Sequence, residues 1–126
     1  MADYLHDDVF DNGLAPLASI IENLYICSQQ PADFTEASST YKLGTKSSPT
    51  INSPSDRGAG GGREVIVDAI TNGVVDATGD ATHFALCDDS ESKLLAAGDL
   101  AALQAVTIGN PFTLTEFSVG IPDPVT

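Results

Sequence analysis

The chain has 126 residues, a length typical of one domain built around a single hydrophobic core. Its 18 Asp and Glu residues far outnumber its 5 Lys and Arg residues, which gives a net charge of −13 at pH 7. Such a surface repels nucleic acid and anionic membranes, and no apolar run is long enough to span a bilayer. Residues 1–10 lack the basic start and apolar centre of a secretory signal, so we expect folding in the cytoplasm.

The first part of the chain predicts a short helix followed by a strand. In residues 11–23, DNGLAPLASIIEN, Asp11 or Asn12 could cap a helix, and Pro16 restricts its start to near Ala15. Residues 24–28, LYICS, alternate as a strand does, with Leu24 and Ile26 on one face and Tyr25 and Cys27 on the other.

The middle of the chain changes in composition and charge. Residues 33–44, DFTEASSTYKLG, are consistent with one helical turn, capped by Asp33 or Thr35 and closed at Gly44. Half of residues 42–63 are Gly, Ser or Pro, and this segment carries four of the five basic residues. The composition predicts a flexible basic arm or loop inside the domain, either simply solvated or docking on an acidic lattice or a neighbouring copy of the chain. The candidate partner-binding residues are Lys42, Lys46, Arg57 and Arg63.

Strand patterns dominate the rest of the chain. Residues 63–70, REVIVDAI, place Val65, Val67 and Ala69 on one face, and Asn72-Gly73 is a hairpin-type turn signal. In residues 81–88, ATHFALCD, Thr82, Phe84 and Leu86 share one face, whereas His83, Ala85 and Cys87 share the other. We expect a loop over 88–92 and two short strands, KLLAAG and QAVTIG, after it.

The last strand pattern, residues 110–122, contains two apolar sets that are out of phase by one residue. Phe112 and Leu114 form the first set, and Phe117, Val119 and Ile121 form the second. A bulge near 115–116, or a strand that passes from one sheet to another there, would account for the shift. The strand spacing predicts a mainly β fold, an antiparallel sandwich or jelly-roll-like barrel, as one domain over residues 1–126.

No residue pattern points to catalysis or to a cofactor. His83 and Cys87 share a face of one strand but lie about 13 Å apart at strand rise, too far for a nucleophile and its base. Cys27 and Cys87 both sit in apolar runs, which favours free buried thiols over a disulfide. Turn aspartates are the simpler explanation for the acidic loops, with a calcium site as the alternative. The aspartates in question are Asp76, Asp80, Asp88 and Asp89.

Three segments resemble a family of small proteins encoded by tailed phages and prophages. They are ICSQQPADFTEA (26–37), ATHFALCD (81–88) and IPDP (121–124), and the resemblance covers nearly the whole chain outside 45–60. The family is similar to phage head decoration proteins and tail-fibre-like β-domains, which implies a structural component of the virion with no catalytic motif. The recurrent residues of these segments then belong to the fold: Cys27, Thr82, His83, Ala85, Leu86 and Asp88.

The resemblance and the charge together favour a capsid decoration, or cement, protein, assembled in the host cytoplasm and located in the virion. The expected partners are the major capsid protein and other virion subunits, with homo-oligomers, trimers among them, and with no nucleic acid or membrane. A tail or fibre-associated module that binds a host glycan or protein is the alternative. A free cytoplasmic enzyme or inhibitor, including a mimic of DNA, is a third reading that rests on the charge alone.

Overall fold

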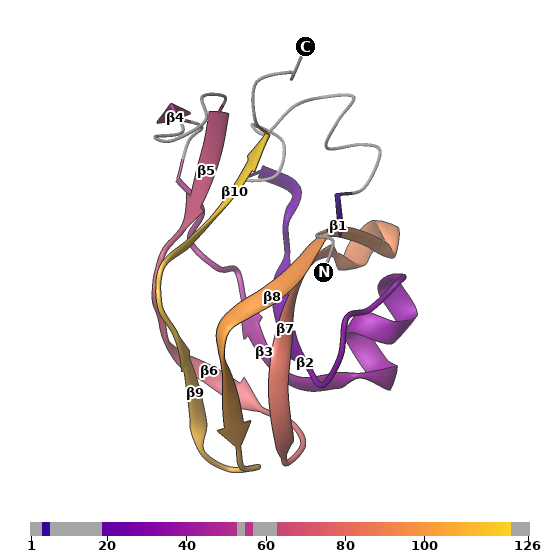
Figure 1. Ribbon diagram of the computed structural model, residues 1–126. Helices are drawn as coiled ribbons and strands as arrows, with labels where there is room; N and C mark the ends of the chain where they lie inside the picture. The colour runs from indigo at the N-terminus through magenta and orange to yellow at the C-terminus, as the bar shows by residue number, and fades with distance from the viewer. Residues whose placement is uncertain (1–3, 6–18, 53–54, 57–62, 122–126) are drawn as a thin grey trace.

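Antiparallel β-strands form nearly all of the regular structure in a computed structural model of the chain, which describes residues 4–5, 19–52, 55–56 and 63–121. The strands form a curled sheet of seven strands and a smaller sheet of three (Figure 1). The large sheet has the order β1 (Tyr4–Leu5), β8 (Lys93–Val106), β7 (Gly79–Asp88), β2 (Asn23–Cys27), β3 (Lys42–Ser47), β6 (Ile70–Val75) and β9 (Pro111–Leu114). The small sheet has the order β10 (Phe117–Ile121), β5 (Arg63–Val67) and β4 (Ser55–Asp56).

Two hydrophobic clusters lie on opposite faces of β2 and β7. The larger cluster takes Leu24 and Ile26 of β2 together with the phenylalanines Phe84 and Phe112. The smaller cluster takes the alternate residues of the same strands, such as Tyr25, Cys27 and Cys87, and is covered by a single π-helical turn, η1 (Glu36–Thr40). The strand predicted at 24–28 is therefore confirmed over residues 24–27, with Ser28 outside it, and its division into two faces is confirmed by the two clusters.

The helical turn predicted in residues 33–44 is present but shorter than expected. The backbone amide of Glu36 donates to the Asp33 carboxylate at 2.8 Å, so Asp33 is the capping residue. The turn ends at Thr40, because the chain already enters β3 at Lys42. Ser19 and Ile20 have helical backbone, but Ile21 and Glu22 do not and β2 begins at Asn23; residues 11–18 lie outside the described residues, so the helix predicted in 11–23 is not confirmed.

The prediction of a flexible arm over 42–63 is wrong for residues 42–47. Lys42–Ser47 is β3, hydrogen-bonded between β2 and β6 in the interior of the large sheet. A Cβ atom on Gly44 would lie 2.8 Å from the Val74 carbonyl oxygen and 3.0 Å from Ile26 Cγ1, so the glycine permits close packing here. Ser55 and Asp56 form β4, and Arg63 begins β5. Arg57 lies outside the described residues.

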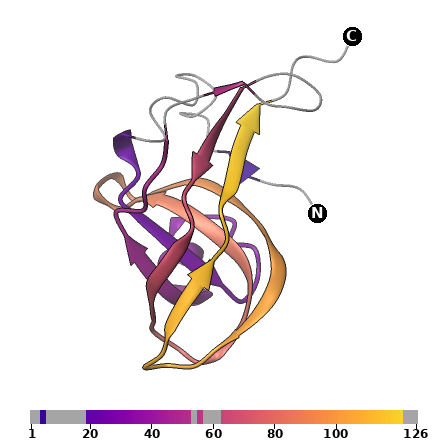
Figure 2. The ribbon, with the colours of Figure 1, turned by 90° about the vertical axis from the view of Figure 1, so that its left-hand side faces the viewer.

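Two neighbouring chain segments cross from the small sheet to the large sheet side by side. β5 pairs with β10, and their continuations β6 and β9 pair with each other (Figure 2). The crossing after β9 occurs at 115–116, as the phase shift in the sequence predicts. The turn predicted at Asn72-Gly73 is wrong, because both residues lie inside β6. A Cβ atom on Gly73 would lie 2.1 Å from the Phe112 ring, so packing explains the glycine.

Residues 93–106 form one long strand, β8, where two short strands were predicted. Its register against β7 shifts twice, once between Leu86 and Cys87 and once between Ala81 and His83. The first shift lets the consecutive residues Leu95 and Ala96 both face the larger cluster, with Leu94 and Ala97 in the smaller. The loop predicted at 88–92 contains a 3-10 turn, η2 (Asp89–Glu91), followed by Ser92 in the left-handed conformation.

Candidate interaction groove

The second register shift makes β8 bulge away from β7. Asp99 is opposite His83 and Gln104 is opposite Ala81, so Leu100–Leu103 face only one β7 residue, Thr82. The chain thus contains three more residues on β8 than on β7 between these pairs. Such a bulge bends the strand and interrupts the ladder of hydrogen bonds.

The bulge forms one wall of a groove, called the edge groove below. The groove has a volume of about 250 Å³, with Phe84 of β7 at its base. One wall is Asp99–Ala102 and Gln104 of β8, and the other is Thr113–Phe117, which spans the end of β9, the junction and the start of β10. The rings of Phe84 and Phe117 have centroids 4.5 Å apart and are inclined by 41°. Because Phe84 belongs to the larger hydrophobic cluster, the base of the groove is continuous with the core.

Side chains fix the positions of the strands around the groove. The Gln104 amide donates to the Thr113 carbonyl oxygen at 2.8 Å and thereby joins β8 to β9. The Ile108 backbone amide donates to the Thr78 hydroxyl at 3.0 Å, which holds the β8–β9 turn against the β6–β7 connection. The groove therefore lies between β8 and β9, which are joined by the Gln104 side chain and not by a β-ladder.

The charges at the groove are all negative. Asp99 accepts a hydrogen bond from His83 Nε2 at 2.9 Å, and the Thr82 hydroxyl lies 2.7 Å from His83 Nδ1. Glu116 is exposed, and none of the lining residues is a Lys or an Arg. The groove thus combines an apolar base with two carboxyl groups, those of Asp99 and Glu116, at its sides.

The strand beside the groove is exposed and uncharged. Residues 100–115 contain no Asp, Glu, Lys or Arg, although the chain as a whole is highly acidic. Within this run Leu103 is 61% exposed and Ile108 is 60% exposed. Exposed strand edges in soluble proteins usually carry charges or other protection, so this run is an unusual feature of the surface.

The two lysines predicted to bind a partner, Lys42 and Lys46, do not line this groove, whereas Arg57 lies outside the described residues. Lys42 Nζ lies 3.7 Å from the Asp76 carboxylate and 5.8 Å from the centre of the Tyr25 ring. Lys46 Nζ donates to the Asn72 side chain at 3.0 Å. Both lysines therefore contact neighbouring strands of their own sheet.

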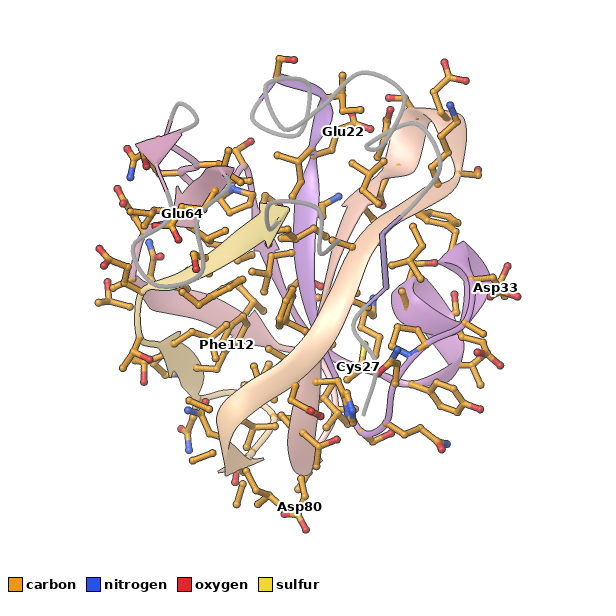
Figure 3. All side chains as sticks on the ribbon, turned by 45° about the horizontal axis from the view of Figure 1, so that its top comes forward. Glu22, Cys27, Asp33, Glu64, Asp80 and Phe112 are labelled. Atoms are coloured by element: carbon orange, nitrogen blue, oxygen red, sulfur yellow. The ribbon has the colours of Figure 1, made fainter. Side chains whose placement is uncertain are left out.

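The four loop aspartates considered for calcium do not come together. Asp76 and Asp80 flank the start of β7, whereas Asp88 and Asp89 lie at its end (Figure 3 shows Asp80 and Glu22, a neighbour of Asp88, at opposite ends of the molecule). Within the ranges that the structure describes, no group of three or more His, Cys, Asp and Glu residues could hold a metal ion.

The acidic end of β7 is held by hydrogen bonds within the chain. The Glu22 carboxylate accepts from the Ser90 backbone amide at 2.5 Å and from the Ser90 hydroxyl at 2.8 Å. The Tyr25 hydroxyl donates to the Asp89 carboxylate. Burial, together with this contact to Asp89, raises the pKa of the Tyr25 phenol. These contacts order the η2 turn against β2.

The two cysteines are free and buried, as the sequence predicts. Burial raises the pKa of the Cys27 thiol to about 12 and also raises that of Cys87. Cys27 lies opposite His83 in the β2–β7 ladder, but its Sγ contacts the Ala37 carbonyl oxygen at 3.7 Å. A neutral, buried thiol is a poor nucleophile, so these residues act as parts of the core.

Fold and groove together describe a mainly antiparallel β protein in which part of the β8 edge has no neighbouring strand within the part of the chain that the structure describes. Comparisons with models of known families, with curated proteins and with solved structures find no match to the chain. Among the residues that the structure describes, no helix has the length and apolar character needed to cross a membrane.

Sequence reasoning missed the groove because its residues come from three separate segments, Phe84, 99–104 and 113–117, which only the fold brings together. The signal that was available is the uncharged run 100–115 in a chain with net charge −13.

Proposed function

We propose that the chain is a structural protein of tailed-phage virions, most specifically a capsid decoration protein that binds the outer head lattice. The exposed, uncharged edge of β8 beside the edge groove carries this proposal, because such an edge is suited to pairing with another protein. The resemblance of segments 26–37, 81–88 and 121–124 to phage proteins gives the class of partner.

The proposed mechanism is contact across the junctions between capsid subunits. Burial of the apolar β8 edge against the lattice provides the attraction, and contacts spread over neighbouring subunits oppose their separation when packaged DNA exerts pressure. The net charge of −13 disfavours contact with the DNA itself. Trimers or other homo-oligomers at the symmetry axes, and closure of the two sheets into a sandwich or jelly-roll-like barrel, belong to the same proposal.

A quantitative protein census of purified virions, with heads and tails analysed separately, tests this function. The proposal expects copies in proportion to capsid subunits, co-purifying with heads. A small number of copies confined to tails would instead indicate the tail or fibre-associated module. Absence of the chain from both fractions would overturn a virion function.

A further inference from the structure

Among the described residues, the backbone of the β8 bulge has almost no strand partner. On the inner side Leu100–Leu103 face only Thr82, and on the outer side the described part of β1 pairs only with Ala96 and Ala97. Unpaired amide and carbonyl groups of a strand edge can bind an extended polypeptide, which then becomes a further strand of the sheet.

The size of the edge groove indicates which part of such a polypeptide enters it. Pockets for small molecules and cofactors typically measure about 300–1,000 Å³, whereas this groove has about 250 Å³. Its base is aromatic and apolar, formed by Phe84 and Phe117. These properties suit one or two apolar side chains of a bound segment better than a cofactor.

The charge at the groove argues for a basic residue in the bound segment. Asp99 and Glu116 lie along it, and no Lys or Arg lines it. Opposite charges on paired strands attract, whereas like charges placed opposite each other destabilise the pair. A second copy of this chain, added through a two-fold axis, would bring its own Asp99 and Glu116 to the same junction.

We propose that the edge groove binds one extended segment of a capsid subunit by strand addition along Leu100–Leu103, which rests on the capsid-binding function proposed above. The segment carries an apolar side chain that enters the groove and a Lys or Arg that faces Asp99 or Glu116. Affinity then comes from main-chain hydrogen bonds and selectivity from these two side chains.

Binding to purified heads that lack the chain tests the proposal. Wild type, Leu103→Lys and Val74→Lys are compared by co-sedimentation over a range of concentrations. Leu103 and Val74 are both 61% exposed, but Val74 lies in β6 between two paired strands and serves as the matched control. We expect Leu103→Lys to weaken binding by about tenfold or more and Val74→Lys to leave it unchanged.

A second pair of variants tests the charge. Glu116→Lys removes a carboxylate at the groove. Glu91→Lys makes the same change in η2, which follows the end of β7 that is distant from the groove, and serves as the control. We expect Glu116→Lys to weaken binding and to reduce its dependence on salt, with Glu91→Lys close to wild type.

Hydrogen exchange on the same samples locates the contact. The amides of residues 100–103 should exchange rapidly in the free protein and become protected on heads. Protection already present in the free monomer would mean that the chain covers this edge itself, and protection that appears only in a dimer would mean that a second copy does. Either result overturns the proposal.

The outcomes separate the binding mode from the function. If wild type binds heads but all four variants bind equally well, the capsid-binding function stands and the groove is not the contact. If wild type binds neither heads nor tails, the function is overturned and the proposed segment with it. Loss of binding in both Leu103→Lys and Val74→Lys would show a contact that is not confined to the groove.

Discussion

Gly73 lies against the ring of Phe112, and this contact sets the packing of β6 on β9. The Phe112 side chain is 1% exposed, so it has no space into which to move. A Cβ atom at position 73 would lie 2.1 Å from the ring, far closer than carbon atoms approach without repulsion. The β6–β9 register also shifts between Ile70 and Gly73, which brings the glycine to this position.

We therefore expect Gly73→Ala to lower the free energy of unfolding by about 1–3 kcal/mol, the usual cost of overpacking a core. Urea denaturation measures this change. Combining Gly73→Ala with Phe112→Leu should cost less than the sum of the two single changes, because the smaller side chain relieves the clash. Purely additive costs would show that the ring does not cause the effect.

Glu22 and Asp88 form a pair of carboxyl groups whose protonation depends on the fold. Hydrogen bonds from Ser90 lower the pKa of Glu22. Burial, and the hydrogen bond with Glu22, raise the pKa of Asp88. A raised pKa in the folded chain means that Asp88 supports folding below its unfolded pKa, and that this support is lost as the pH rises through the folded value.

Asp88→Asn keeps the hydrogen-bonding shape without the charge, so we expect its melting temperature at pH 7 to exceed that of wild type by a few degrees. The difference should shrink as the pH falls, because the raised pKa of Asp88 lets the folded wild type gain its proton at a higher pH than the unfolded chain does. Thermal melts at a series of pH values from 7 downward measure it, with the exposed Asp80→Asn as a control. Lower stability of Asp88→Asn at pH 7 would show that the ionised carboxylate is stabilising.

At the scale of elements, segments with strict alternation and two buried faces were predictable. In residues 24–28 and 81–88, successive side chains point to opposite faces. Both faces are apolar because β2 and β7 lie in the middle of the sheet with a hydrophobic cluster on each face. The crossing at 115–116 was readable as a phase shift, since a strand that changes sheets must change the face that it buries.

Elements that depend on close backbone approach were not predictable. Gly44 and Gly73 read as loop and turn residues, yet both lie in strands where a larger residue would collide with a neighbour. β8 reads as two strands because its exposed middle, Ala101–Leu103, belongs to the bulge. In each case the decisive contact is made by a residue distant in sequence.

The β8 bulge can be removed without changing the strands around it. Deleting Ala101–Leu103 places Leu100 opposite Thr82 and continues the register of Ala81 with Gln104. We expect the free energy of unfolding to stay within about 1 kcal/mol of wild type, because all three residues are exposed. Binding to heads should be lost. Retained binding by this variant would rule out the bulge as the contact.

For the whole molecule, the excess of acidic residues opposes folding. A net charge of −13 on one small domain produces self-repulsion that the unfolded chain partly escapes by expanding. We expect the melting temperature to rise by several degrees between about 0.01 and 0.5 M NaCl, as the screening length falls from about 30 Å to a few ångströms. KCl should act equally, since screening is not specific to the ion. No change would show that local ion pairs offset the repulsion.

The pairing of β2 has a consequence for synthesis of the chain. β2 pairs with β3, which follows closely, and with β7, whose partner residues begin at His83. β7 in turn needs β8, so the large sheet cannot close until residues up to about 106 have left the ribosome. The apolar residues of β2 therefore remain without their cover during most of translation. Like charges repel, so the acidic residues that oppose folding of the finished domain also oppose association between such nascent chains.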